Sequence, residues 1–177
     1  MATTSTTPTH LPSIEPHLRG EAGRELQATL LDLVDLALTG KQLHWSVVGT
    51  HFRALHLQLD ELVDSWRAMS DEVAERASAL GFPPDAQAAT VARASRIDAF
   101  PAGRITDRDV VSGLTRRLAD VIERARYAMA AVRDSISEDI LIDVIRTLEK
   151  QHWMLRAQRD PADLRALDGG DGSDAAA

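Results

Sequence analysis

The sequence predicts an all-α protein, folded as a four-helix bundle with one long crossover that carries a short extra helix. Four segments repeat apolar residues at the three- and four-residue spacing of one helix face. Aromatic residues make up only 4% of the 177 residues, whereas alanine and leucine are abundant. Proline and glycine lie mostly outside the periodic segments, which is typical of a helical protein. The length suffices for one domain with its own core.

The two ends of the chain differ in composition from the middle. Residues 1–20 are rich in Thr, Ser and Pro, and they lack the basic start and apolar run of a signal peptide or membrane anchor. Residues 161–177 are rich in Asp, Gly and Ala. We therefore expect flexible tails at 1–20 and 161–177, the second one acidic, around a bundle domain at 21–160. No stretch approaches the roughly 18 apolar residues of a spanning helix, so we expect a soluble, cytoplasmic protein.

The first two helices are predicted at 21–47 and 51–80. The apolar stripe of the first consists of Leu26, Leu30, Leu33, Ala37, Gly40 and His44. Gly49 allows the turn into the second helix, and the run Gly81-Phe82-Pro83-Pro84 stops that helix. The core face of the second helix consists of Leu55, Leu59, Leu62, Trp66, Met69, Val73, Ala77 and Leu80.

The second half of the chain supplies the crossover and two further helices. The connection at 81–105 has room for a short helix at 85–95 that starts at an Asp85 cap. Its length suits second and third helices that run parallel. The third helix is predicted at 106–136, with a core face of Val111, Leu114, Leu118, Val121, Ala125, Met129, Val132 and Ile136. The fourth is predicted at 138–158, with a core face of Leu141, Val144, Leu148, His152 and Leu155.

The candidate functional residues of the second helix lie away from its core face. His56 is four residues before Asp60, and Asp71 is four residues before Glu75. Each pair therefore lies on one face, one turn apart, as two ligands of one metal ion do. The pairs are separated by 15 residues, or roughly 22 Å along a helix, so one helix cannot close a single site with both. The alternative interpretation is a solvated face, since Asp and Glu are ordinarily exposed.

A two-fold axis would bring the two pairs together. If the second helix packs antiparallel against its copy in another subunit, with the axis near Ser65 and Trp66, the first pair of one chain faces the second pair of the other. Each dimer then has two identical sites. Upstream, His44 continues the apolar stripe of the first helix, where a lone histidine is more often a core residue. Its partnership with the second helix makes it a further candidate ligand.

The stretch from position 44 to 76 resembles the signature of the Dps family, the mini-ferritins or DNA-protecting proteins of starved cells. The resemblance rests on His44-Trp45, Val47, Gly49, Phe52, Leu55-His56, Asp60, Asp71 and Ala74-Glu75-Arg76. It covers roughly residues 21–160, and the segment at 148–155 is similar to that family's last helix. The resemblance implies a ferritin-like four-helix bundle that assembles into a hollow dodecamer.

The resemblance also implies a function. Proteins of this family have inter-subunit ferroxidase centres that oxidise Fe(II), preferably with hydrogen peroxide, and they store ferric mineral inside the cage. Carried over to this sequence, His44, His56 and Asp60 resemble the ligands that one subunit gives. Asp71 and Glu75 resemble those of its two-fold mate. Such a mixed set of nitrogen and oxygen ligands suits iron, and zinc is a second candidate occupant.

Three acidic residues, Asp134, Glu138 and Asp139, cluster at the turn between the third and fourth helices. In the resembling family, acidic residues in this region line three-fold pores that admit iron. The alternative is a helix start that is favoured by negative charge near its N-terminus, and both interpretations stay open. Elsewhere, Glu149 and His152 form the chain's only Glu-x-x-His. An iron centre within one bundle would need a second such motif, so His152 is interpreted as structural.

The alternative from a different class is a nucleoid-associated protein that binds and compacts DNA, with little dependence on iron chemistry. In the resembling family, DNA binding often uses lysine-rich tails. Here the only lysines are Lys41 and Lys150, and the formal net charge is −7. The sequence therefore argues against salt-sensitive DNA binding through the tails. The remaining candidates are the arginines of the third helix, Arg116-Arg117 and Arg124-x-Arg126.

Overall fold

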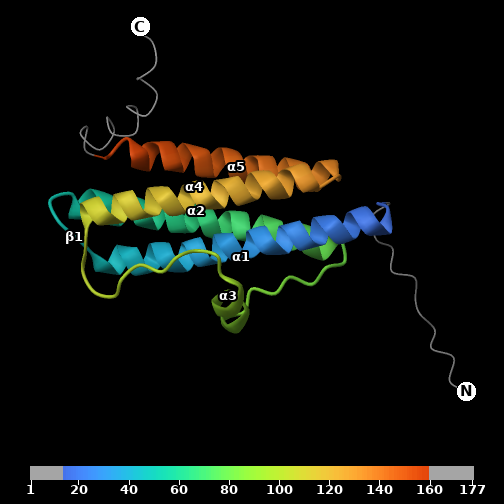
Figure 1. Cartoon of the computed structure of the whole chain (residues 1–177), viewed down its shortest axis with the longest axis horizontal. Coiled ribbons are helices and arrows are strands. Elements are labelled where there is room, and N and C mark those ends of the chain that lie inside the picture. The colour runs from blue at the N-terminus through green and yellow to red at the C-terminus, as the bar shows by residue number, and fades with distance from the viewer. Residues whose placement is uncertain (1–13, 160–177) are drawn as a thin grey trace, which may run out of the picture.

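The computed structural model describes residues 14–159, and most of both predicted tails lies outside this range. The elements are α1 (Pro16–Ser46), β1 (Val47–Val48), α2 (Phe52–Ala79), α3 (Ala88–Ala94), β2 (Ile105–Thr106), α4 (Asp107–Ala131) and α5 (Ser135–Arg156). The four long helices lie side by side, and α3 lies outside them on the crossover (Figure 1). The predicted all-α bundle with one crossover is confirmed. Within residues 14–159, no helix is long and apolar enough to cross a membrane.

The helices α1 and α2 form an antiparallel hairpin whose two long helices approach closely (Figure 1). At its closed end, His44 of α1 lies against His56 of α2. Further along, a Cβ added to Gly40 would lie only 2.6 Å from Cζ3 of Trp66. Glycine therefore allows the close approach, and this approach fixes which residues of the two helices lie level with each other.

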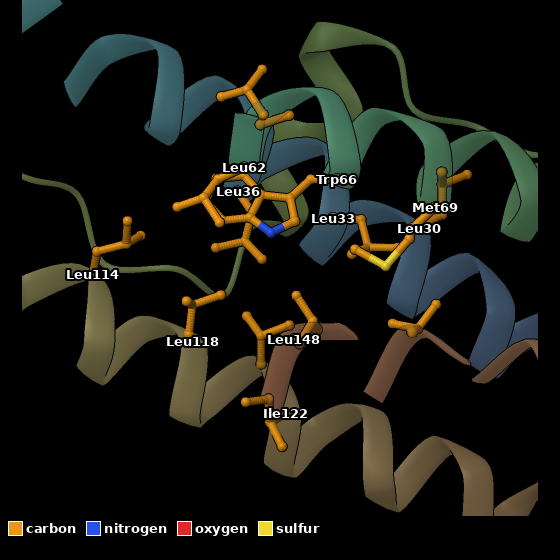
Figure 2. Packing of buried hydrophobic residues seen from close by; sticks show 14 of the residues in the cluster. Leu30, Leu33, Leu36, Leu62, Trp66, Met69, Leu114, Leu118, Ile122 and Leu148 are labelled. Carbon is orange, nitrogen blue, oxygen red and sulfur yellow. The ribbon is translucent and has the colours of Figure 1, made fainter. Parts of the chain in front are cut away.

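The core lies between the four long helices, around the fully buried indole of Trp66 (Figure 2). Its Nε1 donates a hydrogen bond to Oε1 of Gln151 at 2.8 Å, which satisfies the one polar atom of the ring. The predicted core faces of the first two helices are buried throughout. Large leucines of the core with less than 2% exposure include Leu26, Leu33, Leu36, Leu43, Leu55, Leu59, Leu114, Leu118, Leu141 and Leu148. Burial of this apolar surface is the main term that stabilises the bundle.

The crossover is tied to the hairpin turn by a short parallel ladder that the sequence did not predict. Val47 of β1 pairs with Ile105 of β2. The next turn contains Gly49, whose φ is 133°, and a Cβ there would lie 2.5 Å from Cγ of Asp107. The carboxylate of Asp107 accepts a hydrogen bond from the backbone N of His51 at 2.7 Å. The start of α4 is thereby held beside the start of α2, and these two helices run in the same direction, as predicted (Figure 1).

A buried carboxylate anchors the crossover to the bundle. Asp32 of α1 is only 3% exposed. It accepts a hydrogen bond from Arg96, on the crossover, at 2.5 Å and one from Arg124 of α4 at 3.0 Å. Because a buried charge is costly unless it is paired, this cluster joins three segments that are far apart in the sequence.

Several predicted boundaries were wrong. The first helix begins at Pro16, before the expected residue 21, and the short crossover helix begins at Ala88 after an N-cap at Gln87, so Asp85 does not cap it. The largest difference concerns the end of the third helix. The third helix was expected to run to Ile136, but α4 ends at Ala131 and α5 begins at Ser135. The reason is the cap of the next helix: the carboxylate of Asp134 accepts a hydrogen bond from the backbone N of Ser137 at 3.0 Å. Ile136 therefore belongs to α5 and is 57% exposed instead of lying in the core.

Candidate metal centre

Two histidines stack where the end of α1 meets the start of α2. The ring centroids of His44 and His56 are 3.6 Å apart, with an angle of 23° between the ring planes. Nδ1 of His44 lies 2.9 Å from the backbone oxygen of His56, and Nδ1 of His56 lies 2.9 Å from the backbone oxygen of His44. His44 is 8% exposed, and His56 is half-buried. The two imidazoles therefore hold each other in place.

These contacts determine the tautomer of both rings. A carbonyl oxygen only accepts hydrogen bonds, so each Nδ1 must carry the proton, and each Nε2 keeps its lone pair in the neutral ring. Metal-binding histidines are oriented in this way, by a hydrogen bond from the nitrogen that does not bind the metal. The geometry fits a pair of metal ligands better than it fits core histidines that have both nitrogens bonded.

Asp60 lies beside His44, and the carboxylate of Asp60 forms an ion pair with Lys41. Oδ1 of Asp60 is 3.2 Å from Nδ1 of His44 and 2.5 Å from Nζ of Lys41. The hydrogen bond from Lys41 lowers the pKa of Asp60 below its ordinary value of 3.8, and the positive charge of Lys41 acts in the same direction, against the effect of burial. The Asp60 side chain is 41% exposed. It is therefore an accessible, ionised carboxylate whose present cation is an ammonium group.

Asp71 and Glu75 lie on α2, and both are exposed. Within residues 14–159, neither carboxylate has a hydrogen-bond or ion-pair partner. Asp71 borders a hollow between α1 and α2. The two residues therefore have the accessibility of ligands, but nothing in the described part of the chain orients them.

The single chain does not complete a metal site. No group of three or more His, Asp or Glu side chains in residues 14–159 has the geometry to hold a metal ion by itself. His44, His56 and Asp60 do lie together, but the Nδ1 atoms face backbone oxygens and the carboxylate faces Lys41. The other two predicted ligands lie further along the same helix. The predicted ligands thus form two separate groups within the described chain.

Of the three acidic residues near the start of α5, Asp134 is the buried one, at 9% exposure. It caps the helix, and its carboxylate also accepts a hydrogen bond from Nη2 of Arg76 at 2.6 Å. Burial would raise the pKa of Asp134, but the hydrogen bonds from Ser137 and Arg76 outweigh burial and lower it. Glu138 and Asp139 are exposed. Asp134 therefore does what the helix-start interpretation predicts, and the two exposed residues keep their carboxylates for solvent or cations.

The Glu-x-x-His motif of α5 does not form a metal pair. The carboxylate of Glu149 accepts a hydrogen bond from Nε of Arg126 at 2.9 Å, which joins α5 to α4. Burial lowers the pKa of the neighbouring His152, which favours its neutral form. This geometry agrees with the structural interpretation of His152.

Sequence reasoning missed the role of Lys41 at this site. The signal was its position, because Lys41 lies three residues before His44 and therefore close to the same helix face. It is also one of only two lysines in a chain whose other basic residues are arginines.

Comparisons with known proteins identify the family to which the chain belongs. The family described as the ferritin-like domain matches residues 24–163. The DNA protection during starvation protein of Mycolicibacterium smegmatis is 31% identical over 154 residues, which cover 86% of this chain and 84% of the relative. The fine tangled pili major subunit of Haemophilus ducreyi is 38% identical over 146 residues, covering 81% of this chain and 76% of the relative. The solved structure of DpsA14 from Streptomyces coelicolor is 36% identical, with a TM-score of 0.79 and coverage of 82% and 88% of the two chains.

The long crossover, the bundle and the matched domain define a protein of the ferritin-like class. Within that class, the chain belongs to the Dps family. The stretch from position 44 to 76, on which the resemblance was based, lies within the matched range.

Proposed function

We propose that the protein is a ferroxidase and iron-storage mini-ferritin of the cytoplasm. It oxidises Fe(II), preferably with hydrogen peroxide, stores ferric mineral in a dodecamer built from two-fold dimers, and so protects the cell from oxidative stress. One observation carries this proposal: His44 and His56 are oriented through Nδ1 beside an accessible carboxylate, Asp60. A second pair of carboxylates, without a partner within residues 14–159, lies further along α2.

The proposed site is shared by two subunits. His44, His56 and Asp60 are its ligands from one subunit. Asp71 and Glu75 of the partner subunit complete it, because antiparallel two-fold packing of α2 brings the two halves together. Imidazole and carboxylate suit Fe(II), and zinc would use the same ligands. A divalent cation at Asp60 displaces the ammonium of Lys41, which keeps a positive charge beside the carboxylate before iron binds.

The proposed reaction balances with peroxide as the oxidant. Each Fe(II) gives up one electron to become Fe(III), and hydrogen peroxide takes up two, so two iron ions are oxidised per peroxide. The O–O bond breaks, and with two protons both oxygen atoms leave as water. The carboxylates of Asp60 and Glu75 stabilise the higher charge of the product, because ionised oxygen ligands favour the more highly charged cation.

Storage requires that iron reach the interior of the assembly. Each chain has a formal net charge of −7, so an assembly of such chains attracts cations to any acidic opening. Glu138 and Asp139 are exposed at the start of α5, and we propose that they line the pore that admits iron. Asp134 supports this pore from inside, because its carboxylate holds the helix start through Ser137 and Arg76.

DNA binding is the second candidate function, because several relatives are named as DNA protection proteins. In the described part of the chain, most of the arginines proposed for DNA binding already have other partners. Arg117 donates to backbone carbonyls, while Arg124 pairs with Asp32 and Arg126 with Glu149. Of the four arginines proposed from the sequence, only Arg116 has no hydrogen-bond or ion-pair partner among residues 14–159. We expect no gel shift with duplex DNA at low salt, and a shift that disappears at moderate salt would instead favour this candidate.

The test of the iron function is anaerobic Fe(II) oxidation with added peroxide, followed by absorbance. The variants His56→Ala and Glu75→Ala should each lose at least the roughly 10- to 100-fold that changes outside the ligand shell typically cost a metal site. Mixing the two variants after dissociation should restore activity. In a random mixture half of the dimers are mixed, each with one intact site, so about one quarter of the wild-type sites return.

Two matched controls separate ligand loss from general damage. His51→Ala removes an exposed histidine near the same turn, and Glu61→Ala removes an exposed carboxylate adjacent to Asp60 in the sequence. Both should oxidise Fe(II) at the wild-type rate. Equal rates in all single variants would refute the ferroxidase site. Inactive mixed dimers, with inactive single variants, would refute a site shared across the two-fold axis.

A further inference from the structure

A hollow lined by arginines lies between the end of the crossover and the start of α4. Its volume is about 360 Å³, which is near the lower end of the range for small-molecule sites. Arg104, Arg116 and Arg117 contribute to its lining, and Asp109 is the one carboxylate among the described lining residues. The lining is therefore positively charged, although the whole chain has a formal net charge of −7. None of the five candidate metal ligands borders this hollow.

The guanidinium of Arg117 is a buried charge, and the residue is only 5% exposed. Its nitrogens donate hydrogen bonds to the backbone oxygens of Asp98, Gly113 and Ala99 at 2.6, 3.0 and 3.0 Å, and its Cζ lies 3.8 Å from the centre of the Phe100 ring. Within residues 14–159, no carboxylate forms an ion pair with it. Because a buried charge is costly unless an opposite charge pairs with it, the hollow beside Arg117 favours an anion.

A second positive charge follows Arg117 closely in space and sequence. Arg116 is exposed and has no hydrogen-bond or ion-pair partner within residues 14–159. Burial lowers the pKa of Arg117, and the charge of Arg116 lowers it further, whereas Asp98 and Asp120 act in the opposite direction. The two guanidinium groups thus repel each other, and an anion that contacts both would offset this repulsion.

The fold also fixes the third arginine at this hollow. Gly103, whose φ is 102°, turns the chain just before Arg104. Directly after Arg104, Ile105 of β2 is 6% exposed and pairs with Val47 of β1. The backbone of Arg104 is therefore held at the start of the ladder, while its side chain is exposed and has no partner among the described residues.

The first turns of α4 add polar groups to the lining. Ser112 is four residues before Arg116, so the two lie on one face, one turn apart. The Ser112 side chain is exposed, and its hydroxyl has no partner within residues 14–159. The carboxylate of Asp109 already accepts a hydrogen bond from Oγ1 of Thr106 at 2.7 Å. The start of a helix also favours negative charge, so the hollow suits an anion with several oxygen atoms.

We propose that this hollow binds a phosphate dianion, either as inorganic phosphate or as a small phosphate monoester. Arg104 and Arg116 hold the phosphate oxygens, because the planar guanidinium fork matches them with two hydrogen bonds. The charge of Arg117 attracts the dianion from below, and the hydroxyl of Ser112 donates to it. The proposal goes beyond the iron chemistry proposed above and does not depend on it.

The test is calorimetric titration of the full-length protein with sodium phosphate, in chloride buffer of constant ionic strength. Treatment with a chelator first removes any metal that would itself bind phosphate. Arg104→Gln and Arg116→Gln should each weaken phosphate binding at least about tenfold, as expected for a lost hydrogen bond to a charged group. Both residues are exposed, so the variants should keep the wild-type far-UV circular dichroism.

Arg24→Gln is the matched control. It removes the same charge from an exposed position of α1, and α1 begins at the end of the bundle opposite to the start of α4 (Figure 1). This variant should bind phosphate as the wild type does. Ser112→Ala tests the polar contact without any change of charge, and it should weaken binding by a smaller factor, about threefold.

Titration with adenosine 5′-monophosphate and with adenosine distinguishes the two sources of the phosphate group. Tighter binding of the nucleotide than of inorganic phosphate would assign the hollow to a phosphate monoester, and equal or weaker binding would assign it to the free ion. The proposal fails if the wild type takes up no phosphate at millimolar concentration, or if adenosine binds as well as its monophosphate. An equal loss of affinity in Arg24→Gln, Arg104→Gln and Arg116→Gln would also overturn it, because only the net charge would then matter.

Discussion

The two halves of the candidate metal centre lie on the same helix but differ in how the fold holds them. At the start of α2, His56 and Asp60 are bonded to residues of α1: the imidazole to the backbone of His44 and the carboxylate to Lys41. Further along α2, Asp71 and Glu75 project into solvent without a partner in the described part of the chain. The first half is organised by folding of the chain, and in the proposed dimer the second half would be organised by a neighbouring subunit.

This difference has an energetic meaning. Residues that are oriented before a metal binds lose little conformational entropy on binding, whereas exposed side chains must be ordered at that moment. Folding therefore prepares the nitrogen-bearing half of the site in each chain. In the proposed two-fold dimer, assembly would add the carboxylates that raise its negative charge. In this scheme, a subunit without its mate has little affinity for iron, and oxidation starts only in the assembled protein.

The largest expected effect is that substitutions in the two halves differ in how much they destabilise the chain. His44→Ala and Glu75→Ala should both abolish most Fe(II) oxidation, because each removes a proposed ligand. Only His44→Ala should also destabilise the chain, by about 2 kcal/mol, because it removes a buried ring together with its stacking on His56 and its polar contacts through Nδ1. Glu75→Ala should stay within about 0.5 kcal/mol of the wild type, as exposed substitutions usually do. Urea unfolding of each variant measures this, and an equal loss of stability in both would contradict the comparison.

A smaller effect concerns the ion pair that holds the end of α2 next to Asp71 and Glu75. Arg76 follows Glu75 on α2, and its ion pair with Asp134 ties this end of the helix to α5. Asp134→Asn keeps a capping side chain but removes the charge, so it should cost about 2 kcal/mol, as expected for a hydrogen bond to a charged group. The control Asp143→Asn breaks the exposed pair with Arg146 and should have little effect. Equal stability of the two variants would show that the buried pair contributes nothing.

The contribution of Asp134 should depend on pH with a defined sign. Its pKa in the folded protein is lowered below the ordinary value of 3.8. The stabilisation is therefore fully present above the pKa of the unfolded chain and is lost as the pH falls through the folded pKa. The stability difference between the wild type and Asp134→Asn should be largest at neutral pH and should close below about pH 4. A difference that grows on acidification would reverse the assignment.

Much of the fold could be predicted because it follows from helical spacing, and the candidate ligand pairs were proposed on the same basis. The core faces of α1 and α2 needed only the recurrence of apolar residues, and the two ligand pairs needed only a four-residue separation. The end of α4 was missed because Ile136 continues its apolar pattern, whereas the cap at Asp134 ends it earlier. The ladder between β1 and β2 and the ion pair of Lys41 arise from tertiary contacts, which no local pattern encodes.

The smallest expected effect concerns the ion pair between Lys41 and Asp60 in the first half of the candidate site. If the ammonium of Lys41 competes with a metal ion for Asp60, Lys41→Met should bind a divalent cation more tightly than the wild type does. Co(II) serves as the probe, because it stays unoxidised in buffer without peroxide. The expected gain in affinity is about tenfold, the size of effect that is typical of changes around metal ligands. Lys150→Met is the matched control, since it removes the only other lysine and lies on an exposed position of α5. Calorimetric titration of both variants in assembled form gives the comparison. Equal affinities would mean that the ammonium leaves Asp60 at no cost. Weaker binding in Lys41→Met would mean that Lys41 positions the carboxylate for the metal instead of competing with it.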